Sequence, residues 1–214
     1  MTDAPSRVVH CEDAIAWLAQ NPLAEGCAIF TSLPDSSEIK RYSFDEWQAW
    51  FVAAAEAVVR ALPAKSAAIF YQTDVKRDGA WVDKSYLVQR GAYATGARLL
   101  WHRIVLRAPA GIATRTRPGY AHMLCFSHDL GEDPLQSGPD VLPELGEMTW
   151  ARAMGLAAAE VAVQWLAQRA GARCIVDPFC GVGTALAVAN RVGLDAIGVE
   201  LAQGRAQKAR ELTL

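Results

Sequence analysis

An eight-residue segment, Asp177-Pro178-Phe179-Cys180-Gly181-Val182-Gly183-Thr184, constrains the fold of this chain more than any other part of the sequence. It follows a short apolar run at 174–176 and precedes a segment of helical character at 184–192. Glycines at such a turn let the backbone bend sharply and approach a ligand, and the first turn of the next helix offers unpaired N–H groups. Glu200 ends the next apolar run, at the position where an acid binds ribose hydroxyls in nucleotide-type sites. The segment therefore predicts a strand-turn-helix unit that holds a small-molecule cofactor.

Strands and helices are predicted to alternate along the rest of the chain. Period-two and short apolar runs predict seven strands, at 8–10, 27–31, 67–71, 103–107, 122–127, 174–176 and 196–199. Helical periodicity predicts helices at 14–19, 43–62, 84–93, 150–170, 184–192 and 202–212. This alternation specifies a mainly parallel sheet covered on both faces, the doubly wound, Rossmann-like α/β class.

The clearest helix starts at Ser43, where Glu46 completes a capping box, and stops before Pro63. Its apolar residues recur at helical spacing on one face: Phe44, Trp47, Trp50, Phe51, Ala54, Ala55, Val58, Val59 and Leu62. An aromatic stripe of this kind could stack on bases, but its spacing favours core packing.

Composition limits the chain to a globular protein. It has 214 residues, of which 52% are hydrophobic and 21% charged, so a single domain is expected. No run approaches the roughly 20 apolar residues of a membrane span, and residues 1–7 lack the basic and then apolar order of a signal peptide. We therefore expect a cytoplasmic protein without membrane association.

The five cysteines are odd in number and form no C-x-x-C pair, so neither a disulfide framework nor a zinc site is indicated. Cys11, Cys27, Cys125 and Cys174 lie in or beside apolar runs and are expected to be small core residues.

Charge is unevenly distributed in spite of a net charge of −2. Residues 84–128 contain no Asp or Glu, and their basic residues are Lys84, Arg90, Arg98, Arg103, Arg107, Arg115 and Arg117. Residues 129–147 contain six acids, three prolines and no basic residue, which predicts a long irregular loop. Such blocks are usually solvated surface, and the alternative for the first is a basic face that holds phosphates.

The eight-residue segment and the Ile197-Gly198-Val199-Glu200 run resemble the S-adenosylmethionine loop and following strand of the amino-directed DNA and RNA methyltransferases, whose usual form is D-P-F-x-G-x-G-T. The resemblance extends across the whole chain. It is to the permuted branch, in which the catalytic motif precedes the cofactor motif. It implies a circularly permuted methyltransferase domain that binds S-adenosyl-L-methionine, with a catalytic half at 1–128, an acidic loop at 129–147 and a cofactor half at 148–214.

Residues 8–17 are similar to the family's opening strand and turn, and residues 149–152 to the segment beside the methionine end of the cofactor. The resemblance thus implies these cofactor-binding residues: Asp13, Thr31, Thr149, Arg152, Asp177, Pro178, Phe179, Cys180, Gly181, Gly183, Thr184 and Glu200. Cys180 is expected to pack near the cofactor rather than act as a nucleophile, because methyl transfer from a sulfonium needs no thiol. No metal is expected.

Residues 31–35 (TSLPD) are similar to the family's catalytic T-D-P-P-Y or T-S-P-P-Y motif, which makes Ser32, Leu33, Pro34 and Asp35 the candidate catalytic residues. In the family, the first side chain and a backbone carbonyl accept hydrogen bonds from an exocyclic amine, and the aromatic residue stacks on the extruded base. Ser32 and the Leu33 carbonyl can accept those bonds here, although Leu33 replaces a proline.

Asp35 replaces the aromatic residue of that motif. We expect it to orient or deprotonate the target nitrogen, and the alternative is that it caps a turn. Stacking on the base would then come from another loop, through Trp81, Tyr86 or Tyr42.

Polar residues follow the strand at 67–71, and they are expected to face the crevice outside the carboxyl ends of the strands. Capping of loop backbone groups is the alternative role. With the basic block, the candidate substrate-binding residues are Gln72, Asp74, Lys76, Trp81, Lys84, Arg115 and Arg117.

The function indicated is methylation of a base nitrogen in a nucleic acid. Structured RNA is favoured over DNA, because the only segment available as an added recognition region is a short acidic loop that would repel phosphates. Two alternatives stay open: a methyltransferase of a protein or small molecule, and a non-catalytic cofactor-binding subunit. A partner protein or a second copy of the chain is compatible with either.

Overall fold

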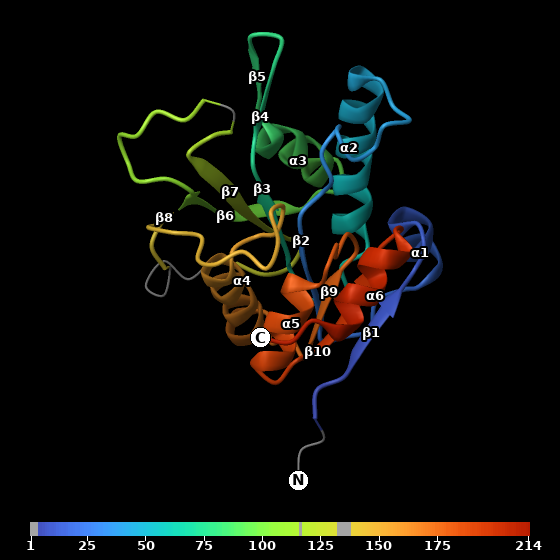
Figure 1. The fold of residues 1–214 in the computed structure, drawn as a ribbon. Coiled ribbons are helices and arrows are strands. Elements are labelled where there is room, and N and C mark those ends of the chain that lie inside the picture. Colours follow the sequence, from blue (N-terminus) through green and yellow to red (C-terminus); the bar gives the residue numbers. More distant parts are fainter. Residues whose placement is uncertain (1–3, 116, 132–137) are drawn as a thin grey trace.

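The computed structural model describes residues 4–115, 117–131 and 138–214, and it has an α/β fold (Figure 1). Within these ranges eight strands form one sheet in the order β1-β10-β9-β2-β3-β7-β6-β8. Their bounds are β1 Arg7–His10, β2 Cys27–Thr31, β3 Ala68–Gln72, β6 Arg98–Leu106, β7 Tyr120–Ser127, β8 Val141–Leu142, β9 Cys174–Asp177 and β10 Asp195–Val199. The α/β class and the mostly parallel sheet are confirmed, and the predicted number of seven strands is wrong.

The additional strand is β8, which pairs with β6 in parallel. It consists of two residues inside the segment predicted to be irregular, too short to give a periodic signal. A separate hairpin, β4 (Val75–Arg77) and β5 (Ala80–Val82), was also not predicted, and Figure 1 shows it projecting from the body of the molecule. The antiparallel pairs of the main sheet are β3 with β7 and β7 with β6.

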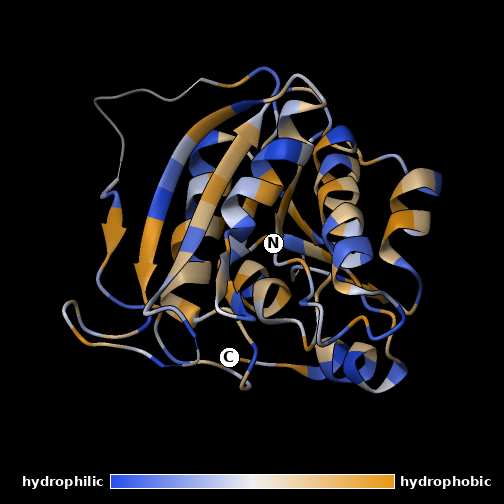
Figure 2. Ribbon diagram, turned by 90° about the horizontal axis from the view of Figure 1, so that it is seen from above, coloured by the Kyte–Doolittle hydropathy of each residue, from blue (hydrophilic) through white to orange (hydrophobic). Residues whose placement is uncertain are grey.

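Helices cover both faces of the sheet (Figure 2), and their buried hydrophobic residues pack against it. One core lies between the sheet and the helices α1 (Ala14–Gln20), α2 (Phe44–Arg60) and α3 (Lys84–Tyr93). The other lies between the sheet and α4 (Leu156–Arg169), α5 (Thr184–Arg191) and α6 (Gln203–Glu211). Residues of β2 and β3 are buried throughout, as expected for strands covered on both sides.

Local side-chain hydrogen bonds fix where the first three helices start. Ser43 and Glu46 form the capping box of α2, with the Ser43 N–H donating to Glu46 Oε2 at 2.7 Å. Asp13 accepts from the N–H groups of Ile15 and Ala16 at the start of α1. Asp83 caps α3 in the same way by accepting from the Tyr86 N–H. Short polar residues directly before an apolar periodic run are therefore reliable start signals in this chain.

The predicted helix at 150–170 starts later than expected, at Leu156. Gly155 precedes it in an extended conformation, and a Cβ there would lie 1.9 Å from the Leu145 carbonyl oxygen. Only glycine fits this close to Leu145, and the first N–H groups of the helix, those of Leu156 and Ala158, donate to the carbonyls of Glu147 and Leu145. Residues 150–154 are consequently free to line a cavity instead of extending α4.

Several predicted core residues are not fully buried. Trp50 belongs to the apolar stripe of α2, but it is only partly buried and lines the cavity. Cys11 is exposed, while Cys27 and Cys125 are buried and Cys174 is partly buried. Among the described residues, no helix has the length and apolar character needed to cross a bilayer.

β1, the first strand in the sequence, is held in the sheet by β10, the last strand. Among the described strands, β1 pairs only with β10, and β2 lies between β9 and β3. Side chains strengthen the connection, since Arg7 donates to the Leu212 carbonyl and Arg210 donates to the Val9 carbonyl. The loops that follow β1, β2, β9 and β10 consequently meet at one edge of the sheet.

Candidate functional site

A cavity of about 360 Å³ opens where these four parallel strands end. Its walls come from the turn after β1, residues 32–35 after β2, residues 177–181 after β9, the end of β10 and residues 150–154 before α4. It thus brings together the two motifs that the sequence analysis singled out, which lie far apart in the chain. The predicted site residues that line it are Asp13, Ser32, Leu33, Pro34, Asp35, Lys84, Arg117, Arg152, Asp177, Pro178, Phe179, Cys180, Gly181, Thr184 and Glu200.

The loop after β9 is held by Asp177. Its Oδ1 accepts hydrogen bonds from the Thr31 hydroxyl at 2.7 Å and from the Phe179 N–H at 3.1 Å. The pKa of Asp177 is raised to about 7, chiefly by burial and also by the nearby charge of Glu200, while the two hydrogen bonds act in the opposite direction. The Asp177 carboxyl therefore populates both its protonated and its ionised form near neutral pH.

Glycines shape the remainder of this loop. Gly181 and Gly183 have φ angles of +56° and +89°, which residues with a Cβ rarely adopt. A Cβ at Gly183 would lie 2.9 Å from Ala209 Cα, so α6 can pack this closely only against glycine. Cys180 packs against β10, where a Cβ on Gly198 would lie 2.8 Å from its Sγ, and burial raises the pKa of its thiol well above the usual value.

Glu200 is buried at the end of β10 and offers a carboxylate to the cavity. One oxygen, Oε1, accepts from the Ala202 N–H at 2.7 Å and from Arg205 at 2.8 Å. The other oxygen accepts no hydrogen bond from a residue that the structure describes. The hydrogen bond with Glu200 raises the pKa of Arg205, so this cation stays charged and holds the carboxylate in place.

The loop after β2 carries an ion pair at the position where the catalytic motif that it resembles has an aromatic ring. Lys84 Nζ donates to Asp35 Oδ1 at 2.5 Å, and the exposed fractions of these side chains are 4% and 32%. Trp47 Nε1 donates to the Pro34 carbonyl and fixes the loop from behind. Neither the Ser32 hydroxyl nor the Leu33 carbonyl hydrogen-bonds to another described residue, and both residues line the cavity.

Aromatic rings do line the cavity, but they are not the three that were predicted to stack on the base. Trp81, Tyr86 and Tyr42 are absent from the wall, whereas Trp50, Tyr71, Trp150 and Phe179 are part of it. Trp50 and Phe179 meet edge to face with ring centroids 6.0 Å apart. The apolar surface for a planar ligand therefore comes from α2 and the two loops before α4 and α5, which sequence spacing could not bring together.

Three predicted cofactor residues lie behind the wall. Thr31 is fully buried and acts on the site through its hydrogen bond to Asp177. The Thr149 hydroxyl lies 2.6 Å from the Thr184 hydroxyl, which does line the cavity. Gly183 lies against α6, as described above. Each supports a residue of the wall rather than facing the cavity.

Two predicted substrate residues, Gln72 and Asp74, face away from the cavity. Successive side chains of a strand point to opposite faces of the sheet, and here Tyr71 and Thr73 have the cavity side. Gln72 is fully buried, and its amide group lacks a hydrogen-bond partner among the described residues. The polar run was correctly placed at the end of the strand, but its alternate members were assigned to the wrong face.

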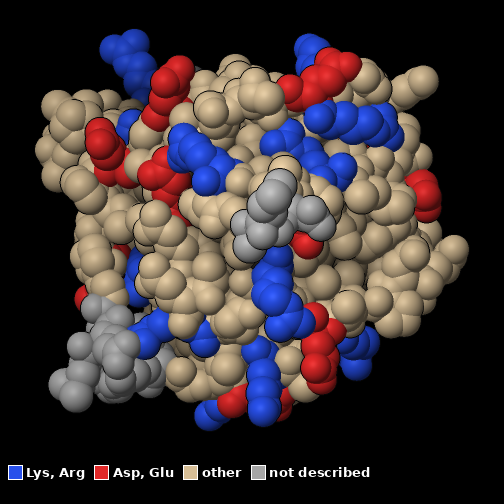
Figure 3. All heavy atoms as spheres, turned by 90° about the horizontal axis from the view of Figure 1, so that it is seen from below, with Lys and Arg blue, Asp and Glu red and all other residues tan. Residues whose placement is uncertain are grey.

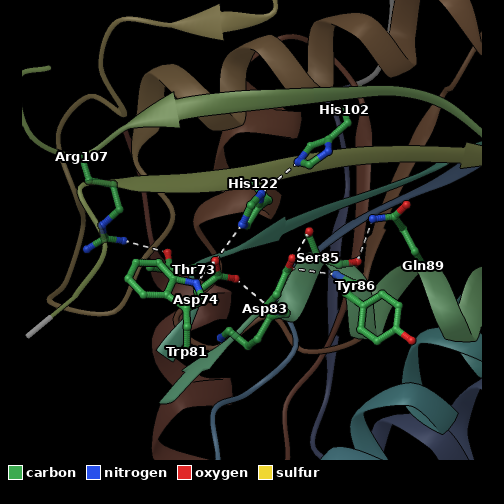
Figure 4. A network of polar contacts seen from close by, with 11 residues as sticks. Thr73, Asp74, Trp81, Asp83, Ser85, Tyr86, Gln89, His102, Arg107 and His122 are labelled. Atoms are coloured by element: carbon green, nitrogen blue, oxygen red, sulfur yellow. Dashed lines mark hydrogen bonds and ion pairs between the residues drawn. The ribbon is translucent and has the colours of Figure 1, made fainter. Parts of the chain in front are cut away.

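Asp74 instead joins a buried network on the α3 side (Figure 4). It accepts from His122 Nε2 at 2.9 Å, from Trp81 Nε1 at 2.9 Å and from the Lys84 N–H at 2.8 Å. Burial alone would raise the pKa of Asp74, but the hydrogen bonds from His122 and Trp81 lower it overall. The network continues from His122 to His102, whose ring nitrogens lie 2.9 Å apart.

Lys76, Trp81 and Arg115 also lie outside the cavity wall. They belong to the exposed hairpin β4–β5 and to the segment beside it. Several cavity residues were not predicted, chiefly Glu38, Arg107, Trp150 and Arg205. Arg107 could have been found as a member of the basic block. Arg205 lies five residues after Glu200 in the sequence, and the two side chains form an ion pair.

Basic residues gather at the cavity, among them Lys40, Arg41, Lys84, Arg107, Arg117 and Arg152. Arg152 is partly neutralised by Glu38 at 3.4 Å. The face seen in Figure 3 differs, since Lys and Arg are interspersed with Asp and Glu there. Five acids also line the cavity, and Asp35, Glu38 and Glu200 among them pair with Lys84, Arg152 and Arg205. The seven Lys and Arg side chains of the wall therefore leave a modest excess of positive charge.

Comparison with known proteins identifies the fold. No family model and no curated protein matches the chain. A presumed DNA modification methylase from Thermus thermophilus, complexed with S-adenosyl-L-methionine, is similar with a TM-score of 0.72 and 22% identity over 96% of this chain and 93% of that one. The cytosine-N4-specific PvuII DNA methyltransferase is similar with a TM-score of 0.74 and 14% identity, over 98% and 87% of the chains. M1.HpyAVI in complex with S-adenosyl-L-methionine gives 0.64 and 14%, over 96% and 98%.

Proposed function

We propose that this chain is an S-adenosyl-L-methionine-dependent methyltransferase that modifies a base nitrogen in DNA. The observation that carries the proposal is the meeting of the 32–35 loop and the 177–184 loop in one basic cavity. Two of the three structural neighbours are described as DNA-modifying enzymes, and two are complexes with S-adenosyl-L-methionine. The chain order of the two loops supports the permuted arrangement, with halves at 1–128 and 148–214.

The residues present fit this cofactor. Glu200 offers an oxygen with no hydrogen bond from a described residue, which suits a pair of ribose hydroxyls. Phe179, Trp50 and Trp150 offer apolar surface to planar and aliphatic parts of the ligand. Gly181 lines the cavity with a φ of +56°, a backbone conformation that favours glycine.

When bound, S-adenosyl-L-methionine would supply an electrophilic methyl group. The chain's own task is to hold a nucleophilic lone pair in line with it, which is a problem of positioning. We assign the Ser32 hydroxyl and the Leu33 carbonyl to accept hydrogen bonds from the target amine. Asp35 is fixed by Lys84, so we assign its carboxylate to orient the same nitrogen.

DNA is preferred over RNA as the first substrate to test because two of the three structural neighbours are described as DNA-modifying enzymes. The sequence argument for RNA depended on the acidic segment 129–147, part of which lies outside the described residues. The basic cavity is compatible with either nucleic acid, since phosphates are common to both.

The decisive experiment measures transfer of labelled methyl from S-adenosyl-L-methionine to genomic DNA and, separately, to total RNA, both from source cells that lack this gene. Nucleoside analysis should find the label on one amino-methylated base of DNA. Label in RNA alone would identify RNA, and not DNA, as the substrate. No label in either pool, with cofactor binding intact, would contradict the proposal and favour a protein substrate or a partner-dependent subunit.

Glu200→Ala is expected to weaken cofactor binding about 10- to 100-fold, because buried hydrogen bonds to a charged group contribute about 1.5–3 kcal/mol. Calorimetric titration with S-adenosyl-L-methionine measures the effect. The matched control is Glu56→Ala, which removes an exposed carboxylate that pairs with Arg60 on α2. Equal affinities of the two variants would remove Glu200 from the cofactor site.

A further inference from the structure

The hairpin β4–β5 carries an exposed aromatic ring in a fixed orientation. The Trp81 side chain is 47% exposed, yet its indole N–H donates to buried Asp74 at 2.9 Å. Tyr120 of β7 lies nearly parallel to it, with ring centroids 6.4 Å apart and an interplanar angle of 21°. Figure 4 shows the indole held beside Asp74, which His122 fixes from the other side. A large apolar ring is thus presented to solvent and prevented from turning into the core.

A cation, Lys76, contacts this ring. Lys76 faces Trp81 across the hairpin, and its Nζ lies 4.8 Å from the indole centroid. The same Nζ donates to the Thr114 carbonyl at 3.4 Å, which places the segment with Arg115 and Arg117 beside the hairpin. At the hairpin tip Asp78 pairs with Arg77, and Asp74 and Asp83 flank the base of the hairpin, so the cation placed against the ring is Lys76.

The hairpin is rooted at the cavity. Thr73, shortly before β4, and Lys84, shortly after β5, both line the wall. Arg107 donates to the Thr73 hydroxyl at 3.1 Å and lines the cavity as well. Along the chain, Trp81 therefore lies three residues before Lys84 and eight residues after Thr73, both of which line the cavity.

We propose that Trp81, Tyr120 and Lys76 form a stacking platform for an unpaired base of the DNA strand next to the target nucleotide. Stacking on an aromatic ring tolerates any base, and the adjacent cations suit the phosphates on either side of it. A platform fixed before binding loses little conformational entropy when the base stacks. This inference rests on the proposed function and adds to it a second contact with the nucleic acid, outside the cavity.

The test uses fluorescence anisotropy of a labelled single strand of about 20 deoxythymidines, longer than the site size of a typical single-strand binding groove, with full-length protein and no methyl donor. Trp81→Ala is expected to weaken binding about tenfold or more, whereas Trp81→Phe keeps a ring and should retain most of the affinity. Lys76→Gln should reduce the salt dependence by about one phosphate contact. Tyr93→Ala is the matched control, because it removes a 52% exposed ring from the last turn of α3.

Cofactor affinity should be the same in all four variants, since none of these side chains lines the cavity. Equal binding by Trp81→Ala and the parent, an equal loss in Tyr93→Ala, or no binding by the parent would overturn the platform. Equal competition by polyglutamate would also overturn it, by indicating a site for acidic protein segments. The binding measurement does not depend on methyl transfer. If Trp81→Ala changes neither DNA methylation nor the affinity for the single strand, the platform is refuted and the proposed activity is not. Trp81-dependent binding without any methylation refutes only the proposed activity.

Discussion

Asp177→Asn is expected to make the cofactor-free protein more stable than the parent at pH 8, by about 4 kcal/mol. The Asp177 carboxyl has a pKa of about 7 in the folded chain and an ordinary value of 3.8, and burial is the main cause of the difference. Each pH unit between the two values costs the folded state about 1.4 kcal/mol, because the unfolded chain has already lost the proton that the folded chain retains. An asparagine can still accept from Thr31 and Phe179 without bringing a charge into the site.

The pH dependence gives this prediction its sign. Below the unfolded pKa both states are protonated, so burial of the carboxyl carries no charge penalty. Stability of the parent should therefore fall from about pH 4 to pH 7 and then level off, whereas the variant should lack that part of the decline. Urea unfolding at about pH 5, 6.5 and 8 measures it, and the advantage of the variant should shrink toward the lowest of these pH values.

Asp195→Asn provides a control, because its effect on stability should change with pH in the opposite direction. Hydrogen bonds from Ser6 lower the pKa of Asp195, so its contribution to stability is present at high pH and lost as the pH falls. A stability gain by Asp177→Asn that is the same at both ends of this pH range would mean that the native carboxyl titrates normally.

Asp35→Ala is expected to destabilise the protein by about 3 kcal/mol, and Asp35→Ala with Lys84→Met should recover most of that loss. Removal of one partner leaves a buried charge uncompensated, whereas replacement of both partners by apolar groups is often close to neutral. The lower end of the usual range of about 3–5 kcal/mol applies because the Asp35 side chain is 32% exposed. Lys84 is nearly buried and packs near the Phe51 ring, so a methionine can fill its place.

The same variants separate stability from chemistry. Urea unfolding of the parent, both single variants and the double variant gives the coupling energy of the pair. If Asp35 orients the target, methyl transfer should stay low in the double variant although its stability returns. A double variant that transfers methyl groups at the parent rate would limit the pair to a structural role.

Local signals predicted most of the elements. The helix at 84–93 has its predicted bounds, because Asp83 supplies a cap and the apolar spacing is regular. The strand-turn-helix unit at 174–192 was found from residues adjacent in sequence. What failed was the part that depends on distant neighbours. The start of α4 is set by the contact of Gly155 with Leu145, and β8 exists only because β6 offers it a partner.

The candidate site shows the same division. The two loops could be located from their motifs, but their supporting contacts join residues far apart, such as Thr31 with Asp177 and Asp35 with Lys84. Gln72 and Asp74 were placed at the correct strand end and on the wrong face, because the register of β3 with its neighbours decides which alternate residues face the cavity. Spacing alone does not contain that register.

The pairing of β1 with β10 has a consequence for how the chain acquires its structure during synthesis. Until residues 195–199 have been made, β1 has no partner, and until β9 appears one edge of β2 is open although all five of its residues are buried in the finished sheet. Contacts of such high sequence separation slow folding and leave apolar strand edges exposed to other molecules. A fragment that ends before residue 174 should therefore aggregate, and the nascent chain should depend on protection until β9 and β10 have both emerged.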